Sequence, residues 1–203
     1  MLICFEGIAG SGKTTQIELL ADHLIKVTGR EVLISSVYEG ERRKTVSNFM
    51  NVSGIKLNQV AIMFLFQALH TVQYNEVIKA IDSGKVVIAD RWRYSFFAHH
   101  LQENTIGSDK NLMNQLDFLA YKSLEPDICF LLDVPPLIAH ERYLKRENSI
   151  SDNGLELMND GYFHSVSQYY NQLARTKGWR IVDGSRDPQD IFHEIRDEVD
   201  QIL

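Results

Sequence analysis

The chain has 203 residues, of which 44% are hydrophobic, and a formal net charge of -6. A chain of this size can bury one substantial core, so we expect residues 1–203 to form a single α/β domain. The negative charge argues against a nucleic-acid-binding surface, and no apolar run reaches the ~20 residues of a membrane span. Cys4 and Cys129 lie in apolar runs without metal-ligand spacing, which indicates buried thiols in a cytoplasmic protein whose partner is a small molecule.

The first segment with a chemical signature is Met1–Gln16, MLICFEGIAGSGKTTQ, which reads as a buried strand, a glycine loop and the start of a helix. Its spacing fits G-x-x-x-x-G-K-[ST], in which backbone N–H groups surround a phosphate, the lysine reaches the β and γ oxygens and the hydroxyl binds Mg²⁺. An ordinary strand-to-helix turn would need neither the lysine nor the threonine. We therefore predict a nucleotide phosphate site formed by Gly7, Ala9, Gly10, Ser11, Gly12, Lys13, Thr14 and Thr15.

The next segments alternate between helix and strand. Apolar spacing predicts a helix over Gln16–Val27 that ends at Gly29, and Glu31–Val37 reads as a second strand. The polar segment after it, Tyr38–Lys44, follows the carboxyl end of that strand, where ligands bind in open α/β sheets. Its basic residues could face an anionic substrate or could be an ordinary solvated charge run, and both interpretations stay open for Arg42, Arg43 and Lys44.

A long helix is predicted over Asn58–Ile81, with apolar residues around most of its circumference. It is therefore buried on two sides within one subunit, or it packs on a second subunit through outward positions such as Met63. Phe66 and His70 share one face of this helix. They could line a pocket for a base, or they could be a core aromatic and a hydrogen-bonded core histidine.

A third buried strand, Lys85–Asp90, ends in Asp90-Arg91. A carboxylate and a guanidinium at this strand end would lie beside the glycine loop, although a surface ion pair is the simpler alternative. The segment Trp92–His100 carries aromatic and histidine side chains into a helix that could cover a planar ligand.

The rest of the chain completes the alternation. We expect a strand at Asp127–Val134, a helix at Ile138–Glu147, a helix at Tyr162–Thr176, a strand at Trp179–Val182 and a helix at Pro188–Leu203. The basic end of the Ile138–Glu147 helix and the polar residues after it could be a closing lid or an ordinary exposed helix end. Five strands alternating with helices predict a parallel sheet with helices on both faces.

Taken together, these motifs resemble the thymidylate kinase family over nearly the whole chain. The resemblance rests on FEGIAGSGKTTQ, GKVVIADRW, PDICFLLDVPP, ERYLKR and IVDGSRDPQDI. It implies a P-loop kinase fold with strand order 2-3-1-4-5, a lid at about residues 142–156, ATP and Mg²⁺, a nucleoside monophosphate acceptor and a homodimer.

The resemblance also implies roles for individual residues. Lys13, Asp90, Arg91 and Arg146 would be catalytic, with Thr14 and Asp90 supporting the metal. Arg142 and Arg186 would join the glycine loop in binding ATP. The acceptor side would comprise Glu6, Arg42, Phe66, His70, Arg91, Ser95, His99 and His100.

The chain departs from the family pattern mainly on the acceptor side. Ala9 replaces the usual acidic loop residue, His70 replaces an arginine that reads the base, and His99-His100 replaces a Tyr-Gln pair. The arginine after the second strand is missing or displaced to Arg42 or Arg43, and the lid carries Asp152-Asn153 in place of Asp-Arg. We therefore expect a phosphotransferase for thymidylate or a modified pyrimidine nucleotide, with a kinase for a non-nucleotide metabolite or a non-catalytic nucleotide-binding regulator as alternatives.

Overall fold

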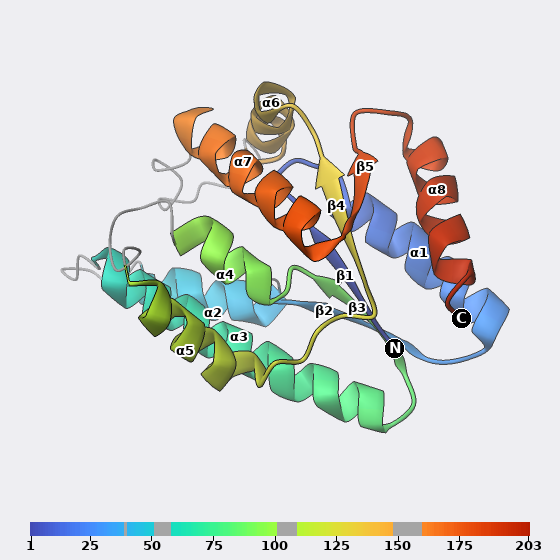
Figure 1. Ribbon diagram of the computed structural model, residues 1–203, viewed down its shortest axis with the longest axis horizontal. Coiled ribbons are helices and arrows are strands. Elements are labelled where there is room, and N and C mark those ends of the chain that lie inside the picture. The colour runs from blue at the N-terminus through green and yellow to red at the C-terminus, as the bar shows by residue number, and fades with distance from the viewer. Residues whose placement is uncertain (39, 51–57, 101–108, 148–159) are drawn as a thin grey trace.

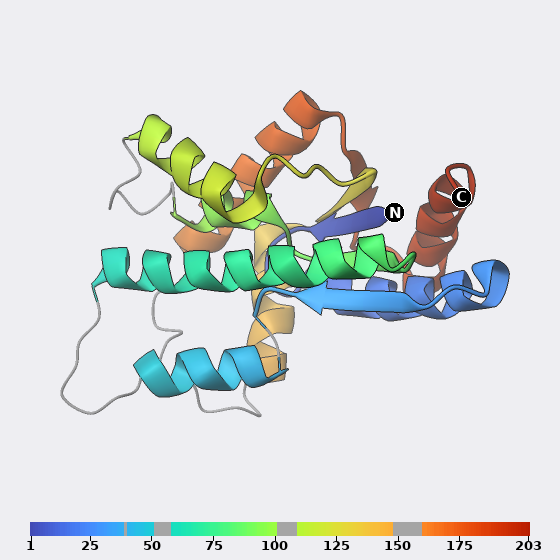
Figure 2. The ribbon, with the colours of Figure 1, turned by 90° about the horizontal axis from the view of Figure 1, so that it is seen from below.

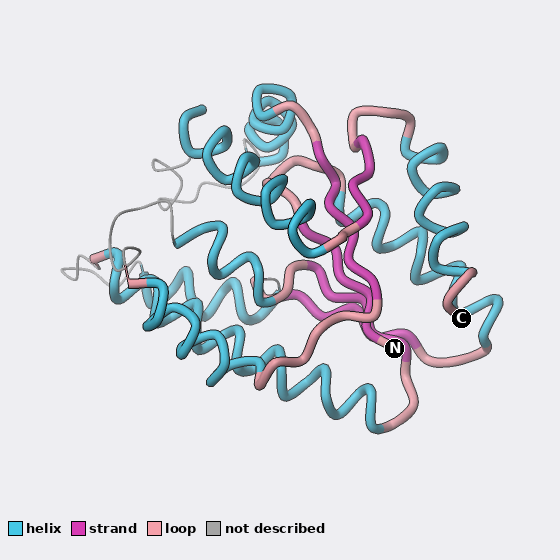
Figure 3. Tube along the Cα trace, in the orientation of Figure 1, coloured by secondary structure: helices cyan, strands magenta, loops and turns pink. Residues whose placement is uncertain are grey.

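The computed structural model describes residues 1–38, 40–50, 58–100, 109–147 and 160–203. One parallel sheet crosses the molecule in the order β2-β3-β1-β4-β5, with helices on both sides of it (Figures 1 and 3). The strands are β1 Leu2–Glu6, β2 Val32–Ser36, β3 Val86–Asp90, β4 Ile128–Asp133 and β5 Arg180–Asp183. The helices are α1 Lys13–Thr28, α2 Gly40–Met50, α3 Gln59–Asp82, α4 Arg93–His100, α5 Lys110–Tyr121, α6 Pro136–Glu147, α7 Asp160–Lys177 and α8 Pro188–Asp200. The predicted fold class and strand order are confirmed.

The three central strands are buried on both faces, which explains their nearly continuous apolar sequences. On one face, Ile3 and Phe5 of β1 pack with α1 and α8 through residues such as Leu20 and Ile195. On the other face lie α3, α4, α5 and α7, whose contacts with the sheet form two further apolar clusters. Cys4 and Cys129 are neighbours in the β1–β4 register, and both are buried free thiols as predicted.

The helix α3 lies alongside β2 and extends beyond the carboxyl end of that strand (Figure 2). Its first half therefore reaches the edge of the sheet where ligands bind in this architecture. The buried row of α3 is Met63, Gln67, His70, Gln73, Val77 and Ala80. Half of the residues in that row are polar, so the positions of the apolar residues of α3 do not show which side of the helix is buried.

This arrangement corrects one expectation. Met63 does not face outward: it is 0% exposed and packs with Phe96 and Met113 inside one subunit. The outward apolar residues of α3 are instead Phe64 and Val72, which are 51% and 50% exposed.

Two helices were not predicted. α2 begins at Gly40 inside the segment that we interpreted as polar and irregular, and it buries Val46. α5 begins after Asp109, whose carboxylate caps the backbone N–H groups of Asn111 and Leu112. Within the described residues, no helix combines the length and the apolarity needed to cross a membrane.

Candidate active site

The carboxyl ends of the central strands meet where the glycine loop joins β1 to α1. Phe5 near the end of β1 is in register with Asp90 at the end of β3, and Ser36 at the end of β2 pairs with the same residue. Parallel sheets bind ligands at this edge. The topology thereby brings the predicted loop, Asp90 and Arg91 together.

The glycine loop has a backbone that other residues would not fit. Gly7, Gly10 and Gly12 have φ values of 139°, 79° and 94°. A Cβ on Gly10 would lie 2.1 Å from the carbonyl oxygen of Ala139, and one on Gly7 would lie 2.7 Å from that of Leu132. The loop is therefore held close against β4 and α6.

Lys13 and the first turn of α1 complete the loop. The Lys13 ammonium donates to the carbonyl oxygens of Gly7 and Ile8, each at 3.0 Å, so the positive charge lies inside the loop. Thr14 and Thr15 are exposed in the first turn of the helix. This combination of a helix N-terminus, a lysine and exposed hydroxyls fits the phosphates of a nucleotide.

Asp90 has the property expected of a group that supports a metal ion. Its Oδ1 is buried and has no hydrogen-bond partner among the described residues. A buried carboxylate oxygen without a partner is costly unless a ligand, an ion or water satisfies it. The residues present therefore fit Mg²⁺, which takes oxygen ligands and keeps several waters beside phosphates.

Arg91 links the glycine loop to α4 and α7. Its Nη1 donates to the Gly7 carbonyl at 3.0 Å and to the Tyr170 hydroxyl at 3.1 Å, and lies 3.4 Å from Ser95 Oγ and from His99 Nε2. Burial lowers the pKa of this guanidinium, but Tyr170, Asp90 and Glu6 raise it, and the net shift is upward. Arg91 is therefore a fixed positive charge beside the loop, not the surface ion pair of the simpler interpretation.

Glu6 lies behind Arg91, fully buried at the end of β1. Its carboxylate accepts hydrogen bonds from the Trp92 backbone N–H at 2.9 Å and from Ser95 Oγ at 2.7 Å. Burial raises the pKa of Glu6, while Arg91 and these hydrogen bonds oppose that rise. Glu6 thus holds the first turn of α4 in place, and direct contact of Glu6 or Ser95 with a substrate stays a prediction.

Two histidines of the predicted acceptor side lie in different surroundings. His99 is partly buried, within reach of Arg91, and its Nδ1 contacts the Tyr162 hydroxyl. His70 is 2% exposed and its Nδ1 contacts the Tyr121 hydroxyl, as the core interpretation expected. Only His99 is brought next to Arg91.

The other acceptor candidates lie at the end of β2 and on the first half of α3. Phe66 is partly buried, with its ring centroid 5.5 Å from that of Tyr38. Arg42 donates to the Ser36 carbonyl and to Glu76, at 2.9 Å for the latter, so its guanidinium lies at the carboxyl end of β2. That position is compatible with binding an acceptor phosphate, which stays a prediction.

On the donor side, Arg142 of α6 donates to the Gly184 carbonyl at 3.0 Å, which joins α6 to the turn after β5. Arg186 in that turn is exposed and pairs with Glu194. A Cβ on Gly184 would lie 2.9 Å from the Ser11 carbonyl, so this turn packs directly on the glycine loop.

Several predicted positions lie outside the described residues. They are the side chains of Arg43, His100 and Arg146 and the lid residues from 148 onward, including Asp152 and Asn153. Their proposed roles stay predictions.

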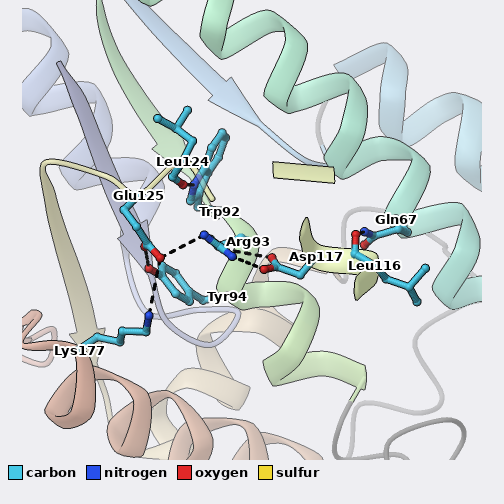
Figure 4. Close-up of polar contacts among 9 residues, drawn as sticks. All are labelled: Gln67, Trp92, Arg93, Tyr94, Leu116, Asp117, Leu124, Glu125 and Lys177. Atoms are coloured by element: carbon cyan, nitrogen blue, oxygen red, sulfur yellow. Dashed lines mark hydrogen bonds and ion pairs between the residues drawn. The ribbon is translucent and has the colours of Figure 1, made fainter. Parts of the chain in front are cut away.

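Sequence reasoning missed a polar network that holds α4. Arg93 donates to Asp117 of α5 and to Glu125, and Lys177 of α7 pairs with Glu125 from the other side (Figure 4). It also missed Tyr170, which contacts both Arg91 and Ser95. Tyr170 is one of the buried residues of α7. Its hydroxyl, on the apolar side of the helix, was the available sign in the sequence of a buried polar contact.

Comparison with known proteins agrees with this geometry. The sequence model described as thymidylate kinase matches residues 5–195. Thymidylate kinases from Thermosipho melanesiensis and Thermosipho africanus are 30% and 32% identical to the chain, and each alignment covers 100% of the chain and 99% of the relative. A crystal structure of thymidylate kinase from Ehrlichia chaffeensis has the same fold, with a TM-score of 0.71 and 22% identity over 98% of both chains. A P-loop that holds Lys13 beside Asp90 and Arg91, on a sheet of this order and with a family match over most of its length, places the chain in the thymidylate kinase family.

Proposed function

We propose that the chain transfers the γ-phosphoryl group of ATP to a nucleoside monophosphate, with thymidylate as the expected acceptor. The observation that carries this proposal is the contact of Arg91 with the Gly7 carbonyl at 3.0 Å, because it places one guanidinium between the phosphate loop and the side chains of α4. The family match and the named relatives support the same reaction.

In this proposal the protein acts by position and charge. The loop N–H groups and Lys13 hold the donor phosphates, and the planar guanidinium of Arg91 spans donor and acceptor phosphates as charge moves between them. Thr14 and Asp90 would hold Mg²⁺, which would supply positive charge to neutralise the phosphates. None of these steps needs a side-chain nucleophile.

On the acceptor side, the residues that depart from the family pattern affect which nucleotide the enzyme would use. Ala9 supplies no carboxylate for the acceptor sugar, and His99 places an imidazole 3.4 Å from Arg91. Imidazole nitrogens can donate or accept hydrogen bonds, so they are compatible with thymidylate and also with a pyrimidine whose base or sugar differs from it. We therefore include deoxyuridylate and 5-substituted pyrimidine monophosphates among the candidate acceptors.

A panel of monophosphates and phosphorylatable metabolites, incubated with ATP and Mg²⁺ and followed by ADP release, tests the proposal. Turnover on a nucleotide supports it, and the best acceptor is identified by kcat/KM. Turnover only on a non-nucleotide metabolite, or ATP binding without turnover on anything, would overturn it in favour of the two alternatives.

We further propose that two copies of the chain form a homodimer in the cytoplasm. α3 and α5 pack together, and each leaves two large apolar side chains uncovered: Phe64 and Val72 on α3, and Phe118 and Leu119 on α5. Phe118 and Leu119 are 58% and 69% exposed. Apolar residues gathered on packed helices mark interaction surfaces, and a two-fold contact would cover both copies at once.

A further inference from the structure

Arg91 has a backbone conformation that few residues other than glycine adopt. Its φ is 68°, in the left-handed region, directly after the last residue of β3. A side chain in this region is strained, and such residues persist only where neighbouring groups hold them. The contacts of the Arg91 backbone therefore decide where its guanidinium points.

Three hydrogen-bond acceptors and donors hold the backbone at Arg91 and Trp92. The Arg91 N–H donates to the Phe5 carbonyl at 3.0 Å, and the following N–H, of Trp92, donates to Glu6. The Arg91 carbonyl accepts from Gln73 Nε2 at 2.9 Å. Of these partners, Gln73 is the one that belongs to neither β1 nor β3.

Gln73 is fully buried on α3, and both its Nε2 and its Oε1 have hydrogen-bond partners. Its Nε2 also donates to the Ser35 carbonyl at 3.2 Å, and its Oε1 accepts from the Tyr121 hydroxyl at 3.0 Å. Ser35 is in register with Ala89 of β3. One amide group thus ties the ends of β2 and β3 to the helix that covers them.

The direction of each bond in this group is determined. Two carbonyl oxygens face Nε2, so the amide cannot be flipped, and the Tyr121 hydroxyl must donate to Oε1. Burial raises the pKa of Tyr121 well above its ordinary value, so the hydroxyl keeps its proton. The oxygen of Tyr121 then accepts from Nδ1 of the buried His70.

We propose that Gln73 is a positioning residue for phosphoryl transfer: it fixes the left-handed backbone of Arg91 and so directs the guanidinium toward the glycine loop. This inference rests on the role given to Arg91 in the proposed function. Without the Gln73 donor, the Arg91–Trp92 peptide keeps only the bond from the Trp92 N–H to Glu6. The strained conformation is then held less firmly, and the contact between Arg91 and Gly7 weakens.

The same helix supplies a matched control. Gln67 is also buried on α3, 8% exposed, and its Nε2 donates to a backbone carbonyl, that of Leu116 in α5 (Figure 4). Gln67→Leu therefore removes a buried amide from the same helix without touching Arg91. General damage to the packing of α3 would affect both variants alike.

The experiment compares kcat and the KM for ATP of the wild type, Gln73→Leu, Gln73→Met and Gln67→Leu, with the best acceptor at saturation. Gln73→Met keeps the length of the side chain but has no proton to donate to Arg91. We expect kcat to fall at least tenfold in both Gln73 variants, which is about 1.4 kcal/mol in the barrier, with the KM for ATP within threefold of wild type. Gln67→Leu should keep kcat within threefold.

Retention of wild-type kcat in a folded Gln73 variant, or an equal loss of kcat in Gln67→Leu, would overturn the inference. If Gln73→Leu does not fold, Gln73→Met decides by the same criterion. If the wild type phosphorylates no nucleotide, the proposed function fails on its own. The position of Arg91 is then followed by the backbone amide resonance of Trp92, which should shift in the Gln73 variants and not in Gln67→Leu.

Discussion

The ion pair between Arg93 and Asp117 holds α4, the helix that carries Ser95 and His99 to the active site. The side chains of Arg93 and Asp117 are only 12% and 5% exposed. Arg93 Nε donates to Asp117 Oδ1 at 3.1 Å, and a second bond joins the same two groups. Replacing Asp117 by alanine would leave the guanidinium buried without its main partner.

The cost of that replacement follows from the burial of the pair. Removing one partner of a buried ion pair typically costs about 3–5 kcal/mol, because the remaining charge stays desolvated. Arg93 would keep Glu125, whose Oε1 lies 3.1 Å from Nη1 but which is 48% exposed. We therefore expect Asp117→Ala to lower the unfolding free energy by about 3 kcal/mol, or the Tm by roughly 6–12 °C for a chain of this size.

Urea unfolding followed by circular dichroism measures this loss. The control is Glu194→Ala, which removes the partner of Arg186 in an exposed pair whose side chains are 40% and 43% accessible. Exposed pairs contribute about 0–1 kcal/mol, so the control should stay close to wild type. A loss below about 1 kcal/mol for Asp117→Ala, or equal losses for the two variants, would refute the reasoning from burial.

Three further predictions concern the site and the assembly. Arg91→Lys should lower kcat by about 100-fold or more in the ADP-release assay, because an ammonium cannot span two phosphates as a planar fork does, and a change below threefold would contradict this. Burial raises the pKa of Glu6 above 4.5, so the native state binds more protons than the unfolded state as the pH falls from 7 to 4.5. As the pH falls over this range, the unfolding free energy of wild type, measured by urea titration, should rise relative to that of Glu6→Gln. A constant difference between the two would refute the upward pKa shift. Sedimentation should give wild type twice the 23.3 kDa of one chain and Phe64→Glu the mass of one, and a wild-type mass of one chain across a hundredfold concentration range would exclude the dimer.

The strands and the phosphate loop could be predicted because their signals are local. β1, β3 and β4 are buried on both faces, so their sequences are continuous apolar runs, and the loop motif depends on residues that are adjacent in the chain. The strand order came from the resemblance to a family and agrees with the sheet.

The orientation of α3 could not be predicted, for a physical reason. Its buried row contains Gln67, His70 and Gln73, each of which contacts a polar partner on α5 or at the strand ends, while Phe64 is exposed. Hydrophobic periodicity assumes that the apolar side is the buried side, and here it pointed to Met63 as an outward position. Long-range hydrogen bonds such as that from Gln73 to Arg91 leave no pattern in the sequence.

In the proposed reaction, one enzyme moves a phosphoryl group from ATP to a nucleoside monophosphate with the help of Lys13 and Arg91. Phosphorus NMR of a mixture of ATP, Mg²⁺ and thymidylate tests this most directly, because it follows the donor and the acceptor in the same sample. We expect the γ resonance of ATP to decline while ADP and thymidine diphosphate appear together in equal amounts. Lys13→Ala, folded as judged by circular dichroism, should abolish both changes. ATP loss that yields inorganic phosphate, with no nucleoside diphosphate formed from any nucleotide offered, would contradict this reaction. Unchanged turnover in Lys13→Ala would contradict it as well.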